Sequence, residues 1–247
     1  MRRKTIWGAI VGAVLVLLAG FGSTAFGQTA GANATTTQGA SASHINPSDF
    51  TTKIDNKYFP LKPGTTFFYK GKKAGTADRD VMRVTHSTKR IEGVKCVVVN
   101  DRVLVKGNVT EQTYDWYAQD KKGNVWYFGE NSKEYKNGKV STEGSWEAGK
   151  HGAKPGIIML GHPKVGQVYR EEYQKGVAED MAKVLKLHAT AHVPYGSFHN
   201  VLVTREWSRL DNSAEDKKYA PGLGDIKEIS VKGTHEILKL VNVKHNG

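Results

Sequence analysis

The sequence is poor in the residues and motifs that build covalent, metal and catalytic sites. Cysteine occurs once, as Cys96, so an internal disulfide framework is excluded. Cys96 lies among valines, where we expect a small buried side chain and not a reactive thiol. His235-Glu236 begins like a zinc-protease motif, but Lys239 stands where the second histidine is needed. We therefore predict no metal site, no cofactor and no catalytic residue, and a protein that is more readily a binder than an enzyme.

Long hydrophobic runs are also missing, with one exception at the N-terminus. Positions 6–21 carry no charge and follow Arg2, Arg3 and Lys4, and small residues come next at 25–27 and 32–34. This order is typical of a secretory signal peptide, which we place at 1–34, and it predicts a secreted or extracytoplasmic protein of the cell envelope. An uncleaved membrane anchor remains the alternative, since the run approaches the ~20 residues that span a bilayer.

Acidic residues are outnumbered by basic ones, 24 to 36, which gives a formal net charge of +12. Positions 1–34 hold three basic residues and no acidic one, so the remainder carries 33 basic and 24 acidic residues, a net charge of +9. Such a charge favours anionic envelope polymers or a membrane surface as partners, and nucleic acid is not expected because no binding motif accompanies it. The alternative is that dispersed lysine and arginine only aid solubility.

Helical periodicity is absent, apart from a turn or two that positions 177–185 could form. Residues 35–55 are predicted to be a flexible linker, because 35–43 contain no apolar side chain larger than alanine. Beyond them, runs of β-branched and aromatic residues alternate with glycine-containing turns, and Asn137-Gly138 is a hairpin signal. The predicted strands cover 65–69, 81–91, 94–105, 109–118, 125–128, 168–173, 181–193, 198–208, 226–231 and 235–243.

Internal similarity organises these strands. Positions 62–67 match 164–169, 81–99 match 184–203, and 117–125 match 219–226, with offsets of 101 to 104. We predict an all-β fold of two tandem antiparallel β-meander repeats, 56–150 and 151–247, packed as one curved sheet, half-barrel or sandwich.

Two motifs carry a family resemblance. The pattern Lys-x-Gly-x-x-aromatic begins at Lys62, and a related pattern begins at Lys164; a Tyr-Ala-Pro-Gly-Leu-Gly-Asp-Ile-Lys run occupies 219–227. Both are similar to those of uncharacterised exported bacterial β-proteins. More distantly, the chain resembles the curved sheets of bacterial lipoprotein-carrier proteins, which pack helices inside a half-barrel where this sequence predicts almost none. The resemblance implies export and a curved sheet, and it brings no catalytic motif.

An aromatic hairpin is the candidate binding site. Aromatic residues cluster on both sides of a turn at 121–123, and strand alternation sends them to both faces. Tyrosine and tryptophan offer flat apolar area with a polar tip, which suits a lipid-like or glycan ligand; ordinary core packing is the competing interpretation. The predicted ligand-binding residues are Tyr114, Trp116, Tyr117, Trp126 and Phe128.

Two carboxylates near this hairpin, Asp115 and Glu130, are the acidic candidates. A pair of carboxylates is what a glycosidase uses, so a secreted hydrolase is the alternative function. A third hypothesis is a structural module that pairs with a partner through exposed strand edges. Our leading hypothesis is a non-enzymatic exported binding or scaffold protein of the cell envelope. The sequence leaves the ligand, the oligomeric state and the choice between barrel and sandwich open.

Overall fold

A computed structural model describes residues 45–246 of the chain. These residues form antiparallel strands almost throughout, and their helical content is the 3-10 turn η1, Pro47–Asp49. The first eight strands are β1 Phe50–Thr51, β2 Thr65–Lys73, β3 Thr76–Ile91, β4 Val94–Val105, β5 Asn108–Asp120, β6 Val125–Lys136, β7 Lys139–Ser141 and β8 Trp146–Glu147. The remaining eight are β9 Lys154–Met159, β10 Val168–Arg170, β11 Glu172–Tyr173, β12 Asp180–Val193, β13 Gly196–Ser208, β14 Ala214–Ala220, β15 Gly224–Lys232 and β16 Glu236–His245.

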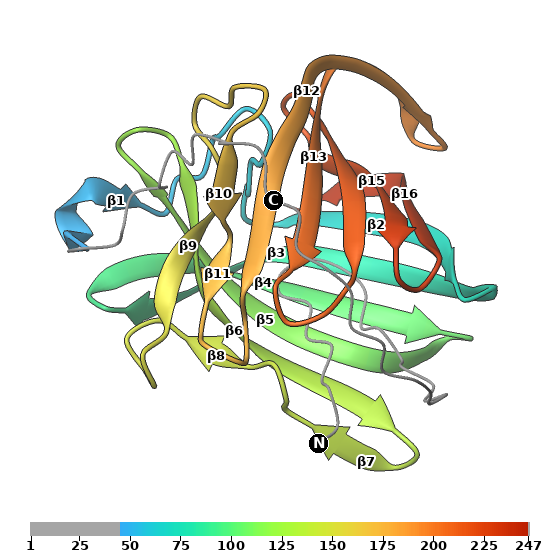
Figure 1. Cartoon of the computed structure of the whole chain (residues 1–247), viewed down its shortest axis with the longest axis horizontal. Coiled ribbons are helices and arrows are strands. Elements are labelled where there is room, and N and C mark those ends of the chain that lie inside the picture. The colour runs from blue at the N-terminus through green and yellow to red at the C-terminus, as the bar shows by residue number, and fades with distance from the viewer. Residues whose placement is uncertain (1–44, 247) are drawn as a thin grey trace, which may run out of the picture.

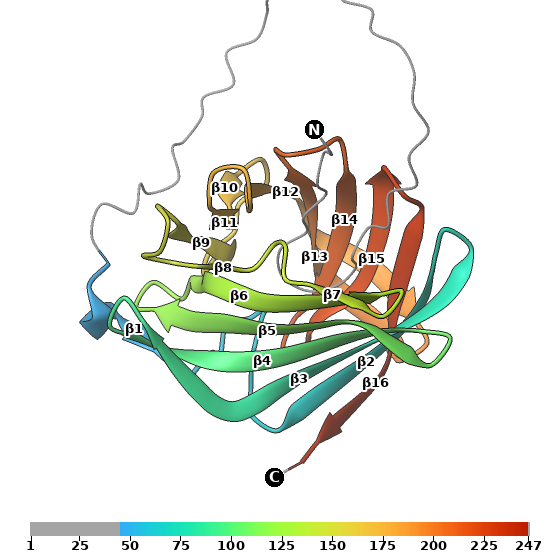
Figure 2. The same ribbon diagram turned by 90° about the horizontal axis from the view of Figure 1, so that it is seen from below.

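The strands join into one curved sheet with the order β10-β12-β13-β14-β15-β16-β2-β3-β4-β5-β6-β9-β11. One layer of the curve contains β2 to β6, and β12 to β15 stand across it (Figures 1 and 2). The predicted all-β class and the curved antiparallel sheet are confirmed. Strands β2 to β6 are neighbours in chain order, as are β10 and β12 to β15, and β16 joins the two sets. The descent of these sets from one duplicated unit, and the domain boundary at 150, stay predictions.

The two ends of the sheet meet at one residue. β10 pairs with β12, β11 pairs with β9, and only Glu171 separates β10 from β11 in the chain. The sheet therefore nearly closes into a barrel-like curve, with its seam at Glu171. Gly156 of β9 lies against this seam, where a Cβ would collide with the backbone of Glu171 and Glu172, so glycine permits the close approach.

Several sequence-based expectations need correction. Positions 177–185 form no helix: a turn precedes β12, which begins at Asp180. Strands β9 and β14 were not predicted. The packed structure also begins before the expected end of the linker at 55, because η1 and β1 form there and Ile54 is buried. The predicted signal peptide, the alternative anchor and positions 35–44 lie outside the described residues. In the range 45–246, no helix is long and apolar enough to cross a membrane.

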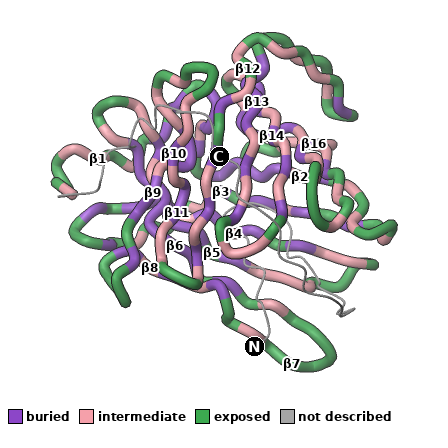
Figure 3. The backbone as a smooth tube through the Cα atoms, in the orientation of Figure 1, coloured by how far each residue is buried: buried purple, intermediate pink, exposed green. Residues whose placement is uncertain are grey.

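Charged residues are segregated by the sheet. Twelve of the chain's 24 acidic residues are buried, against one basic residue, Lys217, among those described. Figure 3 shows the alternation of buried and exposed positions along the strands. The buried acids are Asp78, Asp80, Asp101, Asp115, Glu130, Glu171, Glu172, Asp180, Glu206, Glu215, Asp225 and Glu228. The surface of the molecule is therefore more basic than its net charge indicates.

Candidate functional site

The inner face of the β5–β6 hairpin is a stack of buried aromatic rings. Tyr117 and Tyr127 lie directly opposite each other in the register, with ring centroids 4.9 Å apart in a stacked arrangement. Trp146 meets Tyr127 edge-on at 5.2 Å. Each such contact stabilises by roughly 0.5–1.5 kcal/mol beyond the area it buries. Tyr117, one of the predicted ligand-binding residues, is 0% exposed, so it is part of the core.

The outer face of the same hairpin is covered by the N-terminal segment. Phe50 packs edge-on against Trp126 at 5.9 Å and against Phe128 at 5.5 Å. The indole N–H of Trp126 donates to the Asp120 carboxylate at 2.8 Å. The Lys89 ammonium lies 3.3 Å from the ring centroid of Trp116.

The five predicted aromatic residues therefore do not form one platform. Tyr117 faces inward and Trp116, Trp126 and Phe128 are packed on the other face, an arrangement in which these rings serve as core. Tyr114 keeps a largely accessible ring, with 40% of its surface exposed.

The two acidic candidates are brought together by the register. Asp115 lies directly opposite Glu130, and the Tyr127 hydroxyl is 2.8 Å from Asp115 Oδ1 and 2.9 Å from Glu130 Oε2. A phenol carries one proton and can donate to only one of these oxygens. The second contact is a hydrogen bond only if that carboxyl group is protonated and donates to Tyr127. Burial, with the nearby charge of Asp101, raises the pKa of Asp115 well above its usual range, in agreement with a shared proton.

This carboxyl pair is closed to solvent. Asp115 is 0% exposed and Glu130 is 4% exposed. A glycosidase needs its two carboxyl groups on opposite sides of an accessible sugar, and no such access exists at this pair. The pair is therefore better explained as part of a buried polar network than as catalytic machinery.

A second polar cluster occupies the inner face of β13 and β14. The Lys217 ammonium lies 2.9 Å from Glu206 Oε2 and 3.1 Å from Glu215 Oε1. Glu206 Oε1 accepts hydrogen bonds from the hydroxyls of Tyr219, at 2.9 Å, and Thr204, at 2.7 Å. Burial raises the pKa of Glu215 to about 8 although Lys217 opposes the shift. Burial alone would lower the pKa of Lys217, but the surrounding carboxylates outweigh it and raise that pKa, so the ammonium stays charged.

The segment between β1 and β2 closes one open end of the barrel-like curve. Within this segment Phe59 lies between Tyr117, at 5.6 Å, and Tyr219, at 6.4 Å between ring centroids. The contact joins the two sets of strands, because Tyr117 belongs to β5 and Tyr219 to β14. Beside Phe59 is a small apolar cavity of about 10 Å³, room for about one water molecule. Its walls include Phe59, Leu61, Phe67, Tyr69, Met82 and Asp225.

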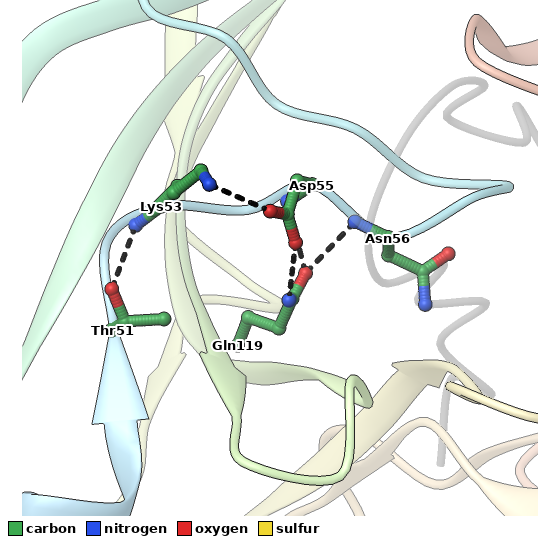
Figure 4. Close-up of polar contacts among 5 residues, drawn as sticks. All are labelled: Thr51, Lys53, Asp55, Asn56 and Gln119. Carbon is green, nitrogen blue, oxygen red and sulfur yellow. Dashed lines mark hydrogen bonds and ion pairs between the residues drawn. The ribbon is translucent and has the colours of Figure 1, made fainter.

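A set of side-chain to backbone hydrogen bonds positions this closing segment (Figure 4). Gln119 of β5 accepts the backbone N–H groups of Asp55, at 3.0 Å, and Asn56, at 2.9 Å, and its amide donates to the Asp55 carboxylate at 2.8 Å. Lys53 pairs with the same carboxylate at 3.1 Å. The hydrogen bonds from Gln119 and Lys53 lower the pKa of Asp55.

Asn56 then turns the chain inward. Its side-chain oxygen accepts the N–H groups of Tyr58, at 2.8 Å, and Phe59, at 3.1 Å. This is an Asx turn, which the sequence could have indicated because asparagine favours such local hydrogen bonds. Sequence reasoning nevertheless missed Asn56, Phe59 and Gln119 as site residues, since their contacts are long-range.

Comparisons with known proteins give the fold's likenesses. No protein-family model matches the chain, and no curated protein matches it either. A solved protein from Bacteroides fragilis, described as exported and as having a YmcC-like fold, shares 14% identity and a TM-score of 0.45 over 76% of this chain and 99% of its own. A protein from Parabacteroides distasonis, described as a lipoprotein, shares 13% identity and a TM-score of 0.41 over 77% of this chain and 100% of its own. Likenesses at this level bear on neither the ligand nor the activity of this chain.

Proposed function

We propose that this protein is an exported, non-enzymatic binding protein of the cell envelope, and that its ligand is lipid-like. The ligand would occupy the apolar end of the sheet where Phe59 now lies. The observation that carries this proposal is the position of the Phe59 side chain, which lies between Tyr117 and Tyr219 and also forms part of the cavity wall. In effect the closing segment supplies the apolar group that a ligand would supply.

The chemistry around Phe59 favours a lipid-like ligand over a glycan. The cavity walls are mainly aliphatic and aromatic, and the polar groups at its edge are few: the Tyr69 hydroxyl donates to the Asp225 carbonyl oxygen at 3.1 Å. Binding sites for apolar ligands have this composition, with few polar groups to orient the bound molecule. A sugar would need many more hydrogen-bonding partners than these walls offer. Of the five predicted aromatic residues, the proposed site retains Tyr117 alone. Displacement of Phe59 by a ligand would uncover Tyr117 and Tyr219, which are buried in the present structure.

Removing Phe59 tests the proposal. The Phe59→Ala variant should bind a fluorescent fatty acid at least tenfold more tightly than the wild type, because the ligand no longer competes with the phenyl ring. Phe50→Ala is the matched control, since it also removes a phenyl ring, but from the outer face of the β5–β6 hairpin. Both substitutions should lower the free energy of unfolding, by about 3–5 kcal/mol when the ring is fully buried. Thermal unfolding therefore accompanies each titration.

Native mass spectrometry of the protein from its natural host identifies the ligand class. A co-purifying lipid that is lost when Tyr117 or Tyr219 is changed to alanine would support the proposal. Equal fatty-acid binding by the Phe59→Ala and Phe50→Ala variants would overturn it, because the gain would then follow from loosened packing and not from the site.

A further inference from the structure

A straight row of five basic side chains crosses the outer face of the sheet. Lys218 of β14 lies directly opposite Lys227 of β15, which lies opposite Lys239 of β16. Lys239 lies opposite Lys70 of β2, and Lys70 opposite Arg79 of β3. Neighbouring strands lie about 4.8 Å apart, so the row extends about 19 Å across the five strands, measured between backbone positions. β16 connects the two layers of the sheet, so the basic row passes across their junction (Figure 2).

The basic row faces outward and lacks acidic partners. Lys70 and Arg79 are exposed and the three other lysines are half-buried, whereas a chain neighbour of each of the five, such as Lys217 or Tyr69, is buried on the inner side. None of the five has an ion pair within 4.0 Å in the described part of the chain. Asp216, two positions from Lys218, is engaged by Arg205 in a bidentate pair.

This arrangement is unfavourable for the free protein. Like charges directly opposite each other on neighbouring strands destabilise a sheet. Burial, together with the charges of Lys218 and Lys239, lowers the pKa of Lys227. Beside the row, Ile229, Ile237 and Lys72 lie opposite one another on β15, β16 and β2, and Phe68 follows on the other side of Lys70. None of these four residues is acidic, so they provide no compensating charge. A bound row of anions would relieve the repulsion.

We propose that the basic row is a binding site for a linear polyanion whose repeated phosphate groups lie across strands β14, β15, β16, β2 and β3. Four of the five side chains are lysines, which bind phosphate groups as point charges and do not require the fixed planar geometry of an arginine fork. The outer face of a sheet that nearly closes on itself is convex, so a flexible chain can follow the basic row more fully than a flat bilayer can. This site is separate from the apolar end beside Phe59.

Long-chain inorganic polyphosphate is the probe for the test. The combined substitution of Lys70, Lys227 and Lys239 by glutamine should weaken binding roughly 100-fold, about fivefold for each lysine. The control replaces three exposed lysines elsewhere, Lys122, Lys136 and Lys164, by glutamine, and so has the same net charge. The dependence of log Kd on log salt concentration should become shallower for the basic-row variant than for the control.

Three outcomes would overturn the proposal. The first is equal weakening in the two triple variants, which would show that only net charge matters. The second is unchanged binding in the basic-row variant while thermal unfolding confirms that it is folded. The third is wild-type binding to vesicles containing phosphatidylglycerol with no binding to polyphosphate, which would assign this face to a membrane.

Discussion

Neighbouring lysines on strand β14 experience opposite surroundings. Lys217 points inward and is held between the carboxylates of Glu206 and Glu215, whereas Lys218 points outward and stands opposite another lysine, Lys227. The same contrast holds for the two faces of the whole sheet, since half of the acidic residues are buried and the described basic residues are almost all outside. Net charge alone conceals this separation, because it adds groups that do not share a solvent environment.

The difference between the two faces follows from how each neutralises its charge. Inside, burial raises the pKa of most carboxyl groups, so that protons take the place of basic partners; Asp80, Asp115 and Glu228 are examples. Outside, water and salt screen the basic residues, which weakens their mutual repulsion without removing it. The interior therefore depends on pH, while the exterior depends on salt.

The Lys217→Met substitution should change the free energy of unfolding more than any other change proposed for the two faces. Removing the ammonium leaves Glu206 buried without its counter-ion, whereas Glu215, with its pKa raised to about 8, can hold a proton at pH 7. Breaking a buried ion pair in this way costs about 3–5 kcal/mol in the free energy of unfolding. Lys218→Met, one residue away on the outer face, should change it by no more than about 0.5 kcal/mol. Urea denaturation of both variants at pH 7 measures the difference. Equal values for the two would show that the two faces are not energetically distinct.

The pH dependence of the free energy of unfolding should report on the buried acidic groups of the inner face. Burial raises the pKa of Glu111 to about 7 and that of Glu215 to about 8. Glutamate in the unfolded chain has a pKa of about 4.3, so the folded state binds these protons more tightly than the unfolded state does. Proton binding therefore stabilises the folded state fully at low pH, and this stabilisation is lost as the pH rises through 7 and 8. The free energy of unfolding should fall between pH 5 and pH 8.5, by about 1.4 kcal/mol per pH unit for each proton that only the folded state retains.

Urea denaturation at constant ionic strength across this range provides the measurement. High salt should leave the slope largely unchanged, because buried groups are poorly screened. Stability that is flat or rises from pH 5 to pH 8.5 would contradict the assignment of protonated acids to the interior.

The double substitution of Asp115 by asparagine and Glu130 by glutamine should have the smallest effect near pH 5. The amides replace carboxyl groups that already share a proton, so the free energy of unfolding should change by about 1 kcal/mol or less, the range of one hydrogen bond. At pH 8.5 the variant should lose less stability than the wild type, because it has no proton to give up at this pair. Glu143→Gln, at an exposed position, is the control for replacing a carboxyl group by an amide.

Local sequence patterns predicted those parts of the fold that have an apolar inner face. Strand β4 was predicted at its observed bounds because it is rich in β-branched valine, and the Asn137-Gly138 turn follows from residues that accept positive φ. Strand β14 was missed because Glu215 and Lys217 occupy inward positions that binary patterning reserves for apolar residues. Strand β9 was missed because Pro155 and Gly156 read as a loop, whereas they serve the close approach at the seam.

The candidate sites depend on register and long-range contacts, which spacing does not give. Asp115 and Glu130 were named from the sequence, but their pairing depends on a register shift, because one extra residue of β6 lies between the pairs Asp115–Glu130 and Tyr117–Tyr127. Phe59 reaches Tyr219 across 160 positions of sequence, and the basic row appears only when five strands are aligned.

A carbon-13 NMR titration of the side-chain carboxyl groups tests the central claim most directly. Assigned resonances of the half-buried Glu111 and the buried Asp115 should keep the chemical shift of the protonated form at pH 6, and Glu111 should titrate near pH 7. This result would show that protons neutralise these carboxyl groups at neutral pH. Titration of Glu111 and Asp115 between about pH 3 and 5, the usual range for exposed acids, would contradict the account.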